Sequence, residues 1–262
     1  MLNQKFGVLV IAHGSPDHAW CEMIREIVRQ VRISVPIELA FLGGDAETSI
    51  PATVARMEKR ELHQIIVVPL FISSYTTHIE EIRYMLGIGG KPSFETDVTT
   101  IIHHAVIHFC EPLDDHPLIV DILLERIKEL YHPKTDEIVL VAHGVNEESA
   151  APRYQQLMEH LQTSIQEALS AFDPHSVHFV HYGTFYPETI RSVVEQAANQ
   201  KIPIVIPYFL SEGHFTKTLI PRKLQGLFYK YTGKALLPHP NISRWIELQV
   251  WNVWKEKGSR YE

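Results

Sequence analysis

The chain has 262 residues, of which 45% are hydrophobic and 21% charged, with a formal net charge of −7. This length suits one large domain or two of about 130 residues each. Phosphate binding needs a concentrated basic face, so the acidic balance predicts that no nucleic acid is a partner. No apolar run approaches the roughly 20 residues of a membrane span, so we also expect no membrane partner. Two cysteines make no disulfide framework, which favours a reducing cytoplasm.

Short apolar runs bounded by turns alternate along the chain with stretches whose apolar residues are spaced by three and four. The runs are predicted strands and the stretches predicted helices. The predicted strands are 6–12, 37–42, 64–71 and 100–107, then 137–142, 176–182, 202–209 and 234–237. The predicted helices are 18–33, 48–61, 78–87 and 117–131, then 148–171, 187–200, 216–229 and 241–256. This alternation favours an α/β fold with a doubly wound parallel sheet covered by helices on both faces.

The second half of the sequence repeats landmarks of the first in the same order. The matching pairs are 8–14 with 138–144, 67–73 with 205–211, and 112–117 with 236–240. A histidine follows each copy of the second landmark, at His78 and His214. Repetition in a fixed order indicates a duplication. The sequence therefore predicts two tandem domains of the same fold, residues 1–132 and 133–262, joined through a polar, proline-containing link near 131–136.

Histidines recur at equivalent strand ends. His13 and His143 directly follow the first strand of their halves, and His78 and His214 come just after the third. Ligands of doubly wound sheets bind beyond the carboxyl ends of the strands, and neighbouring strands lie about 4.8 Å apart. Imidazole is the commonest metal ligand and can also accept a proton near neutral pH. The pattern predicts a site at His13 and His78, with a second site at His143 and His214.

Other kinds of site fit poorly. The glycine-rich and lysine-containing nucleotide motifs are absent, as is any pair of cysteines spaced to bind zinc. Ser15 lacks the glycines of a nucleophile elbow. A phosphatase motif would need arginine where Ala12 and Ala142 stand. His116 and His239 each precede a proline and are expected to cap helices rather than to react.

Taken together, these motifs resemble the sirohydrochlorin chelatases, the cobalt- and iron-inserting class II chelatases, in their long two-domain form. The motifs that carry the resemblance are Ala12-His13-Gly14-Ser15, Ala40-Phe41-Leu42, Val68-Pro69-Leu70-Phe71-Ile72-Ser73 with His78, and Pro112-Leu113 with His116-Pro117. The resemblance covers nearly the whole chain. It implies insertion of a divalent metal, Co²⁺, Fe²⁺ or Ni²⁺, into a tetrapyrrole, without ATP and without an organic cofactor.

The resemblance also implies roles for particular residues. His13 and His78 would bind the metal ion and assist removal of the pyrrole protons. Because the tetrapyrrole carries many carboxylates while the protein is acidic, the site must be locally basic. The residues expected to contact the substrate are Ser15, Arg83, Lys217 and Arg222.

Three departures from the family pattern leave open which half holds the working site. Pro16 stands where the family often has arginine, and Gly43-Gly44 stand where many members have glutamate, with Asp45 or Glu47 as possible substitutes. The family's glycine-histidine segment ending in Ile-Pro is matched better in the second half, at 213–221, than in the first, at 77–83. Glu80 and Glu81 are candidate auxiliary carboxylates, although a solvated helix face is the expected role for both. A non-catalytic carrier of tetrapyrrole or metal stays open as the alternative function, and a metal-dependent hydrolase as a third. A monomer is the simplest expectation for a chain that holds both halves.

Overall fold

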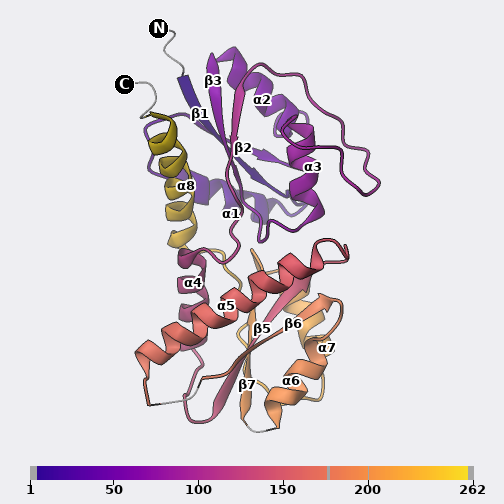
Figure 1. The fold of residues 1–262 in the computed structure, drawn as a ribbon, viewed down its shortest axis with the longest axis vertical. Coiled ribbons are helices and arrows are strands. Elements are labelled where there is room, and N and C mark those ends of the chain that lie inside the picture. Colours follow the sequence, from indigo (N-terminus) through magenta and orange to yellow (C-terminus); the bar gives the residue numbers. More distant parts are fainter. Residues whose placement is uncertain (1–4, 176–177, 200, 259–262) are drawn as a thin grey trace. The chain divides into compact units, whose positions relative to one another are not determined.

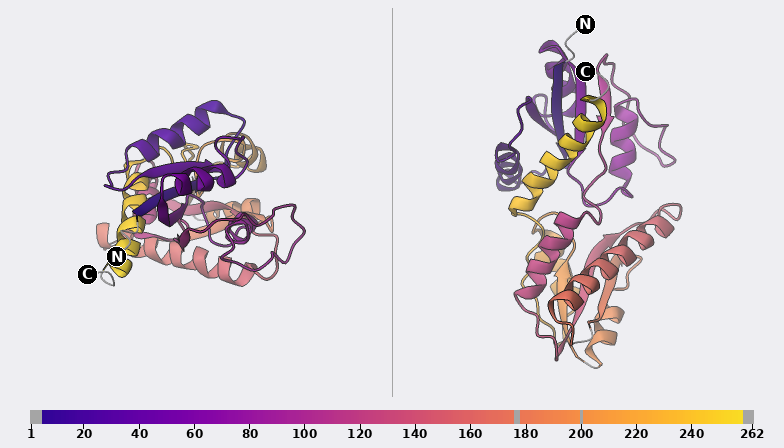
Figure 2. Two further views of the ribbon diagram at one scale, coloured as in Figure 1. Left: turned by 90° about the horizontal axis from the view of Figure 1, so that it is seen from above. Right: turned by 60° about the vertical axis from the view of Figure 1, so that its left-hand side comes forward.

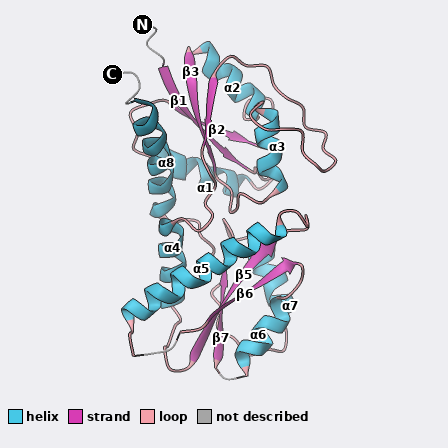
Figure 3. Cartoon of the chain, in the orientation of Figure 1, coloured by secondary structure: helices cyan, strands magenta, loops and turns pink. Residues whose placement is uncertain are grey.

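The structure is a computed structural model that describes residues 5–175, 178–199 and 201–258. The chain forms two compact units (Figure 1). The first contains the chain up to Leu113 together with the residues from Ile242 on, and the second runs from Asp114 to Asn241. Each unit holds a parallel sheet with helices packed against it, as the colouring by secondary structure shows (Figure 3). The predicted α/β fold is therefore confirmed.

The sheet of the first unit has the strand order β2-β1-β3-β4, and every pairing is parallel. Its strands are β1 (Lys5–Ala12), β2 (Ile37–Phe41), β3 (Leu62–Pro69) and β4 (Val106–Phe109). In the register, Ile11 near the end of β1 pairs with Pro69 at the end of β3. The chain segments that leave β1 and β3 therefore start from neighbouring points on one edge of the sheet.

Helices cover both faces of this sheet. They are α1 (His18–Arg29), α2 (Ile50–Lys59), α3 (Thr77–Met85) and α8 (Pro240–Gly258). Side chains of α2 and α3, such as Met57 and Ile82, share one buried cluster with Leu9 and Val67 of the strands. α8 packs beside α1, and Ser243 Oγ of α8 donates a hydrogen bond of 2.9 Å to the Ile27 carbonyl of α1. Figures 1 and 2 show α8, in yellow, beside the sheet of the first unit.

The second unit repeats this plan with the strand order β6-β5-β7, again parallel. Its strands are β5 (Asp136–Gly144), β6 (Val180–Tyr186) and β7 (Ile202–Pro207). Its helices are α4 (Pro117–Lys128), α5 (Ala151–Phe172), α6 (Ile190–Ala198) and α7 (Ile220–Lys223), with a π-helical turn at Phe215–Leu219. Residues of α6 and α7 pack with Val141 and Val205 in one apolar cluster.

The last predicted strand of each half is wrong: the strand expected at 100–107 begins later, and the one expected at 234–237 does not form. β4 begins only at Val106, because Glu58 accepts the backbone N–H groups of His104 and Ala105 just before it. Residues 234–237, all of them described, form no strand. Their apolar side chains are buried all the same, and the Leu236 N–H donates to the carbonyl of Phe209. Burial rather than sheet pairing explains this apolar run.

Two other predicted elements have shifted bounds. The strand expected at 176–182 is β6, at Val180–Tyr186, and the first two residues of the prediction lie outside the described part of the chain. The helix expected at 216–229 ends at Lys223. Gly226 then adopts a positive φ of 87°, and Lys230 bridges to Ile204 of β7. The last residue of the helix predicted at 187–200 is also not described.

The compact units divide the chain differently from the predicted ranges 1–132 and 133–262. α4 follows the first sheet in sequence yet belongs to the second unit, and α8 follows the second sheet yet belongs to the first. Within the second unit, Arg126 of α4 donates to the Ala235 carbonyl at 3.2 Å. The final helix of each sequence repeat is thus exchanged between the units.

The two histidines expected to cap helices do so. His116 Nδ1 accepts the Leu118 N–H at the start of α4, and His239 Nδ1 accepts the Asn241 N–H at the start of α8. Both cysteines, Cys21 and Cys110, are free and buried. Among the described residues, no helix is long and apolar enough to cross a membrane.

Candidate functional site

The structure brings His13 and His78 together at the carboxyl edge of the first sheet. His13 directly follows β1, and His78 is the second residue of α3, which begins shortly after β3. Their ring centroids lie 4.8 Å apart, with an interplanar angle of 70°. His13 is exposed and the His78 side chain retains 37% of its accessible surface. The adjacency predicted from the strand ends is therefore present in the fold.

The turn after β1 sets the orientation of His13. Gly14 adopts a φ of +88°, a conformation that L side chains rarely adopt, and a Cβ there would lie 3.1 Å from the Phe41 side chain. His13 Nδ1 lies 2.9 Å from the Gly14 carbonyl oxygen. A carbonyl only accepts, so Nδ1 carries the proton and Nε2 keeps its lone pair. His13 can therefore bind a cation or take up a proton through Nε2.

Glu81 orients the second imidazole. His78 Nδ1 lies 3.3 Å from Glu81 Oε2, and Thr96 Oγ1 donates to Glu81 Oε1 at 2.8 Å. The Glu81 side chain is only 18% exposed, which corrects the expectation of a solvated helix face, whereas Glu80 is exposed as expected. The i, i+3 spacing of His78 and Glu81 on one helix is the sequence signal that could have revealed the contact.

Both imidazoles consequently expose their Nε2 atom for binding. With both Nδ1 atoms engaged, each Nε2 offers a lone pair at the edge of the sheet. A histidine that donates its other ring nitrogen to a carboxylate or a backbone carbonyl is the usual arrangement of a metal-binding imidazole. Within the described ranges, no group of three or more His, Cys, Asp or Glu residues is placed to hold a metal ion. The arrangement supplies two nitrogen ligands, and such a pair can release an ion more readily than a closed cage.

The other residues expected to contact the substrate in the first unit already have partners. Ser15 Oγ accepts the Asp17 N–H at 3.1 Å in the turn before α1. The Arg83 guanidinium lies 3.1 Å from the Glu111 carboxylate and 4.4 Å above the centre of the Phe109 ring. A carboxylated ligand at Arg83 would therefore compete with Glu111.

Lys217 and Arg222 belong to the second compact unit. Lys217 Nζ lies 3.3 Å from a Glu212 carboxylate oxygen, and the Lys217 side chain is 65% exposed. Arg222 is exposed, and its guanidinium has no ion pair within the described ranges. Both cations are accessible from solvent.

His143 and His214 are arranged differently from His13 and His78. His143 stands at the end of β5, and its Nδ1 lies 3.2 Å from the Gly144 carbonyl oxygen. The rings against it are those of Tyr186, at 5.0 Å, and Phe215, at 5.1 Å between centroids. His214 is exposed, with its ring 6.4 Å from that of Phe215. Among the described residues, His143 and His214 make no ring contact with each other.

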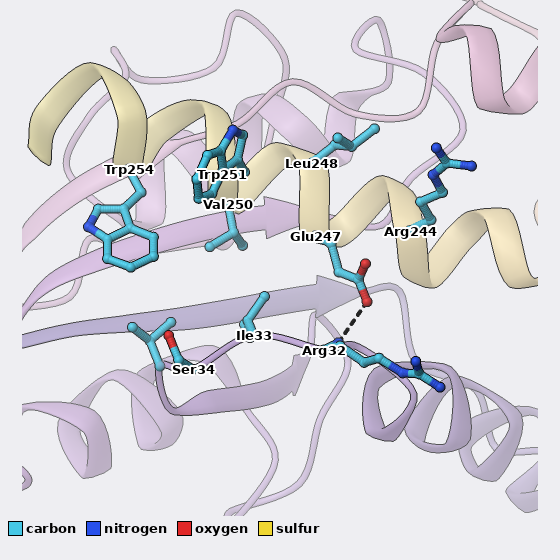
Figure 4. Close-up of a pocket in the computed structure, with 10 residues that line it drawn as sticks. Arg32, Ile33, Ser34, Arg244, Glu247, Leu248, Val250, Trp251 and Trp254 are labelled. Carbon is cyan, nitrogen blue, oxygen red and sulfur yellow. Dashed lines mark hydrogen bonds between the residues drawn. The ribbon is translucent and has the colours of Figure 1, made fainter.

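A cavity of about 480 Å³ lies elsewhere in the first unit (Figure 4). Residues 32–35, in the loop before β2, and side chains of α8 between Arg244 and Trp254 form its lining, and the Arg32 N–H donates to Glu247 Oε1 at 2.7 Å. This loop enters β2 at its amino end, the edge of the sheet opposite His13. The cavity contains none of the predicted site residues.

The family follows from comparison with known proteins. The CbiX family model matches residues 7–130 and again residues 137–250. The chain belongs to the CbiX family. The resemblance to sirohydrochlorin chelatases that its motifs predicted is confirmed, and the two matched stretches lie inside the predicted halves 1–132 and 133–262.

Relatives of the chain match it over part or all of its length. A sirohydrochlorin cobaltochelatase of Methanococcoides burtonii is 26% identical over 132 residues, which are 49% of this chain and 99% of that protein. One of Methanopyrus kandleri is 27% identical over 138 residues, 47% of this chain and 94% of that protein. The structure of SirB from Bacillus subtilis with Fe³⁺ has a TM-score of 0.73 at 18% identity and covers 98% of this chain and 99% of that one.

A second solved structure shares the fold over half of its own length. DR2241 from Deinococcus radiodurans, a multi-domain protein described as structurally similar to chelatases, has a TM-score of 0.58 at 15% identity. The match covers 94% of this chain and 54% of that one. At such identities the two structures show the fold of this chain and not its activity.

Proposed function

We propose that this CbiX-family protein inserts a divalent metal ion, Co²⁺ or Fe²⁺, into sirohydrochlorin or a related tetrapyrrole, without ATP. The observation that carries the proposal is the pair of imidazoles, His13 and His78, with ring centroids 4.8 Å apart at a sheet edge. The names of the two relatives support the same substrate and reaction, and one of them matches half of this chain over nearly its own full length. Ni²⁺ is a further candidate because imidazole accepts it as readily as cobalt.

Metal insertion is a balanced exchange. The ion gains four pyrrole nitrogens, and the macrocycle loses two N–H protons, so the dication replaces two protons. The Nε2 atoms of His13 and His78 can perform both halves of this exchange, since a neutral imidazole is a ligand while the ion is held and a base once the ion is transferred. The proton that each imidazole accepts then passes to water.

Glu81 completes this arrangement as a positioning residue. Its carboxylate accepts from His78 Nδ1 and from Thr96, so His78 is held in the tautomer that directs Nε2 outward. A negative charge beside the imidazole also favours the approach of a cation. In this proposal a carboxylate of the tetrapyrrole pairs with Arg83 and Ser15 donates a hydrogen bond to the substrate, both from the unit that holds His13 and His78.

An absorbance assay tests the proposal. Sirohydrochlorin and Co²⁺ are mixed with the wild-type protein, with His13→Ala and with His78→Ala, and formation of the metallated product is followed. We expect each substitution to lower the rate of insertion by 10²-fold or more, in the range for removal of a group that transfers protons. The matched control is His63→Ala, since His63 is exposed near the amino end of β3, at the other edge of the sheet. Equal rates in all four proteins would refute the assignment.

One observation favours a second candidate function, a carrier that binds tetrapyrrole or metal without catalysing insertion. Gly43 lies beside the His13 backbone, where many family members have glutamate, so no carboxylate is supplied at that position. Wild-type protein that binds sirohydrochlorin or Co²⁺, yet leaves the rate at its uncatalysed value, would establish the carrier.

We further propose that the protein works in the cytoplasm as a monomer. Its two free, buried cysteines suit a reducing compartment, and one chain carries both copies of the family sequence. Light scattering coupled to size exclusion would test the oligomeric state, with a dimer as the result that contradicts this proposal.

A further inference from the structure

A long loop connects α3 with β4 inside the first unit. Between Met85, the last residue of α3, and Val106, the first residue of β4, the chain forms no helix and no strand (Figure 3). Loops of this length without secondary structure of their own are uncommon in compact domains and usually carry a function. We call residues 87–105 the α3–β4 loop.

One imidazole ties the two ends of this loop together. His103 Nδ1 lies 3.1 Å from the carbonyl oxygen of Ala105, the last residue of the loop. His103 Nε2 lies 3.0 Å from the carbonyl oxygen of Leu86, the residue just before the loop. Both separations are those of N–H···O hydrogen bonds. The Ile101 N–H also donates to the Met85 carbonyl at 2.9 Å, so the loop is closed at its base.

Both ring nitrogens of His103 have to donate in this arrangement. A carbonyl oxygen only accepts, and a neutral imidazole has one N–H and one lone pair, whereas the imidazolium has two N–H groups. Only the protonated ring can therefore make both contacts. Loss of the proton turns one contact into a lone pair that faces a carbonyl oxygen. Closing the loop thus takes up a proton, and by linkage a rise in pH favours the open loop.

Charges at the two ends of the loop act in the same direction. The titratable groups there are Glu58 of α2, Arg83 and Tyr84 of α3, His104 of the loop and His108 of β4. Glu58 Oε1 accepts the N–H groups of the two residues that follow His103, at 2.5 Å and 3.0 Å. A negative charge in this place favours the imidazolium over the neutral ring. The Arg83 guanidinium is paired elsewhere, with the Glu111 carboxylate at 3.1 Å.

The middle of the loop reaches the candidate site. Thr96 Oγ1 donates to Glu81 Oε1 at 2.8 Å, and Glu81 is the carboxylate that faces His78 Nδ1. The Val98 N–H donates to Thr96 Oγ1 at 3.2 Å, so this amide reports whether Thr96 is in place. If the base of the loop opens, the Thr96 hydroxyl is free to leave Glu81.

We propose that His103 is a positioning residue: its protonated ring clasps the α3–β4 loop at its base and thereby keeps Thr96 on Glu81, beside His78. The clasp needs no ligand, and only its effect on metal insertion rests on the proposed function. All the groups involved belong to the first compact unit.

Hydrogen exchange of single amides in the full chain tests the clasp. Exchange is measured at about pH 6 and about pH 8, on either side of the ordinary imidazole titration, and each rate is divided by the intrinsic rate at that pH. The reporters are the N–H groups of Ile101, bonded to α3, and Val98, bonded to Thr96. We expect the protection of both amides to fall about 10-fold at the higher pH, because a charged hydrogen bond exceeds a neutral one by about that factor.

His103→Gln removes the titration and keeps a donor. A glutamine amide can serve one carbonyl at any pH, as the neutral imidazole does. This variant should match the wild type at about pH 8, be about 10-fold less protected at about pH 6, and lose the pH dependence. The controls are His104→Gln, which replaces a side chain that is 92% exposed, and His108→Gln, and both should keep the pH dependence of the wild type. Circular dichroism checks that each variant is folded.

Three results would overturn the clasp. The first is equal protection of Ile101 at both pH values in the wild type, and the second is a pH dependence that persists in His103→Gln. The third is a response at Ile101 that does not extend to Val98, since the loop base would then not control Thr96.

The insertion assay measures what the clasp does for His78. At about pH 6 we expect His103→Gln to insert Co²⁺ into sirohydrochlorin about 3-fold more slowly than the wild type, less than for loss of Glu81 itself, because Glu81 still faces His78. At about pH 8 the two rates should agree. Equal rates at about pH 6 would overturn the positioning role. Absence of insertion by the wild type would instead refute the proposed function, and the exchange measurements would still decide the clasp.

Discussion

Glu81 offers the sharpest test of how the first unit prepares an imidazole for a metal ion. Glu81→Ala removes the acceptor at 3.3 Å from His78 Nδ1 and frees that ring to change tautomer and to rotate. Loss of the group that orients a metal-binding histidine typically lowers metal affinity 10- to 100-fold. His78 is 37% exposed and Glu81 18%, so water can replace part of the contact. We therefore expect the lower end, about 10-fold, which corresponds to roughly 1.4 kcal/mol.

Glu81→Gln separates charge from geometry. The glutamine oxygen can still accept from His78 Nδ1, while the negative charge is gone, so we expect a smaller loss of Co²⁺ affinity, about 3-fold, since a charged acceptor is roughly twice as strong as a neutral one. Calorimetric titration with Co²⁺ at fixed pH measures all variants. Glu80→Gln is the matched control, because Glu80 is the adjacent, exposed carboxylate of the same helix and should leave the Kd unchanged. Equal Co²⁺ affinity for wild type and Glu81→Ala, with both folded by circular dichroism, would show that Glu81 does not orient His78.

Three further predictions concern stability, each measured by urea unfolding. Gly44→Ala should cost about 1–3 kcal/mol, because a Cβ there would lie 2.7 Å from backbone atoms. At Gly43 a Cβ would lie 3.8 Å from the His13 carbonyl oxygen, an ordinary van der Waals distance, so Gly43→Ala should change the free energy of unfolding by less than about 0.5 kcal/mol; equal effects would contradict the packing. Burial lowers the pKa of His116 below its ordinary 6.5, so the unfolded chain binds this proton more tightly and stability should fall as pH drops below about 6.5; His116→Asn keeps a capping oxygen and should lessen that fall. Ser243→Ala removes the 2.9 Å hydrogen bond to the Ile27 carbonyl, which still accepts the Gln30 N–H at 3.2 Å, and should cost about 0.5–1.5 kcal/mol, while an unchanged midpoint would argue against the packing of α8 on α1.

The sequence alone predicts those features of the fold that depend on local residue patterns or on the internal repeat. The apolar runs 8–12 of β1 and 138–142 of β5 are fully buried, and their length, composition and the glycine that follows each can be read from the sequence alone. Parallel strands place their carboxyl ends on one edge, so the meeting of His13 with His78 followed from chain order. The same logic did not reveal Glu81, although its i, i+3 relation to His78 was visible, because a helix position gives the face of a side chain but not its partner.

The tertiary structure decided what depends on the direction of side chains and on packing between distant segments. His214 and Phe215 are adjacent in sequence, and only the geometry of the turn after β7 places Phe215 rather than His214 against His143. Residues 234–237 look like a strand because burial alone selects apolar residues, whatever the backbone pairing. Likewise, the apolar stripes of α4 and α8 predict that each helix is covered but not by which sheet, since the hydrophobic effect is not directional. Composition and order therefore determined the fold and the first pair of histidines, and the packing of the folded chain determined which neighbours give each histidine its chemistry.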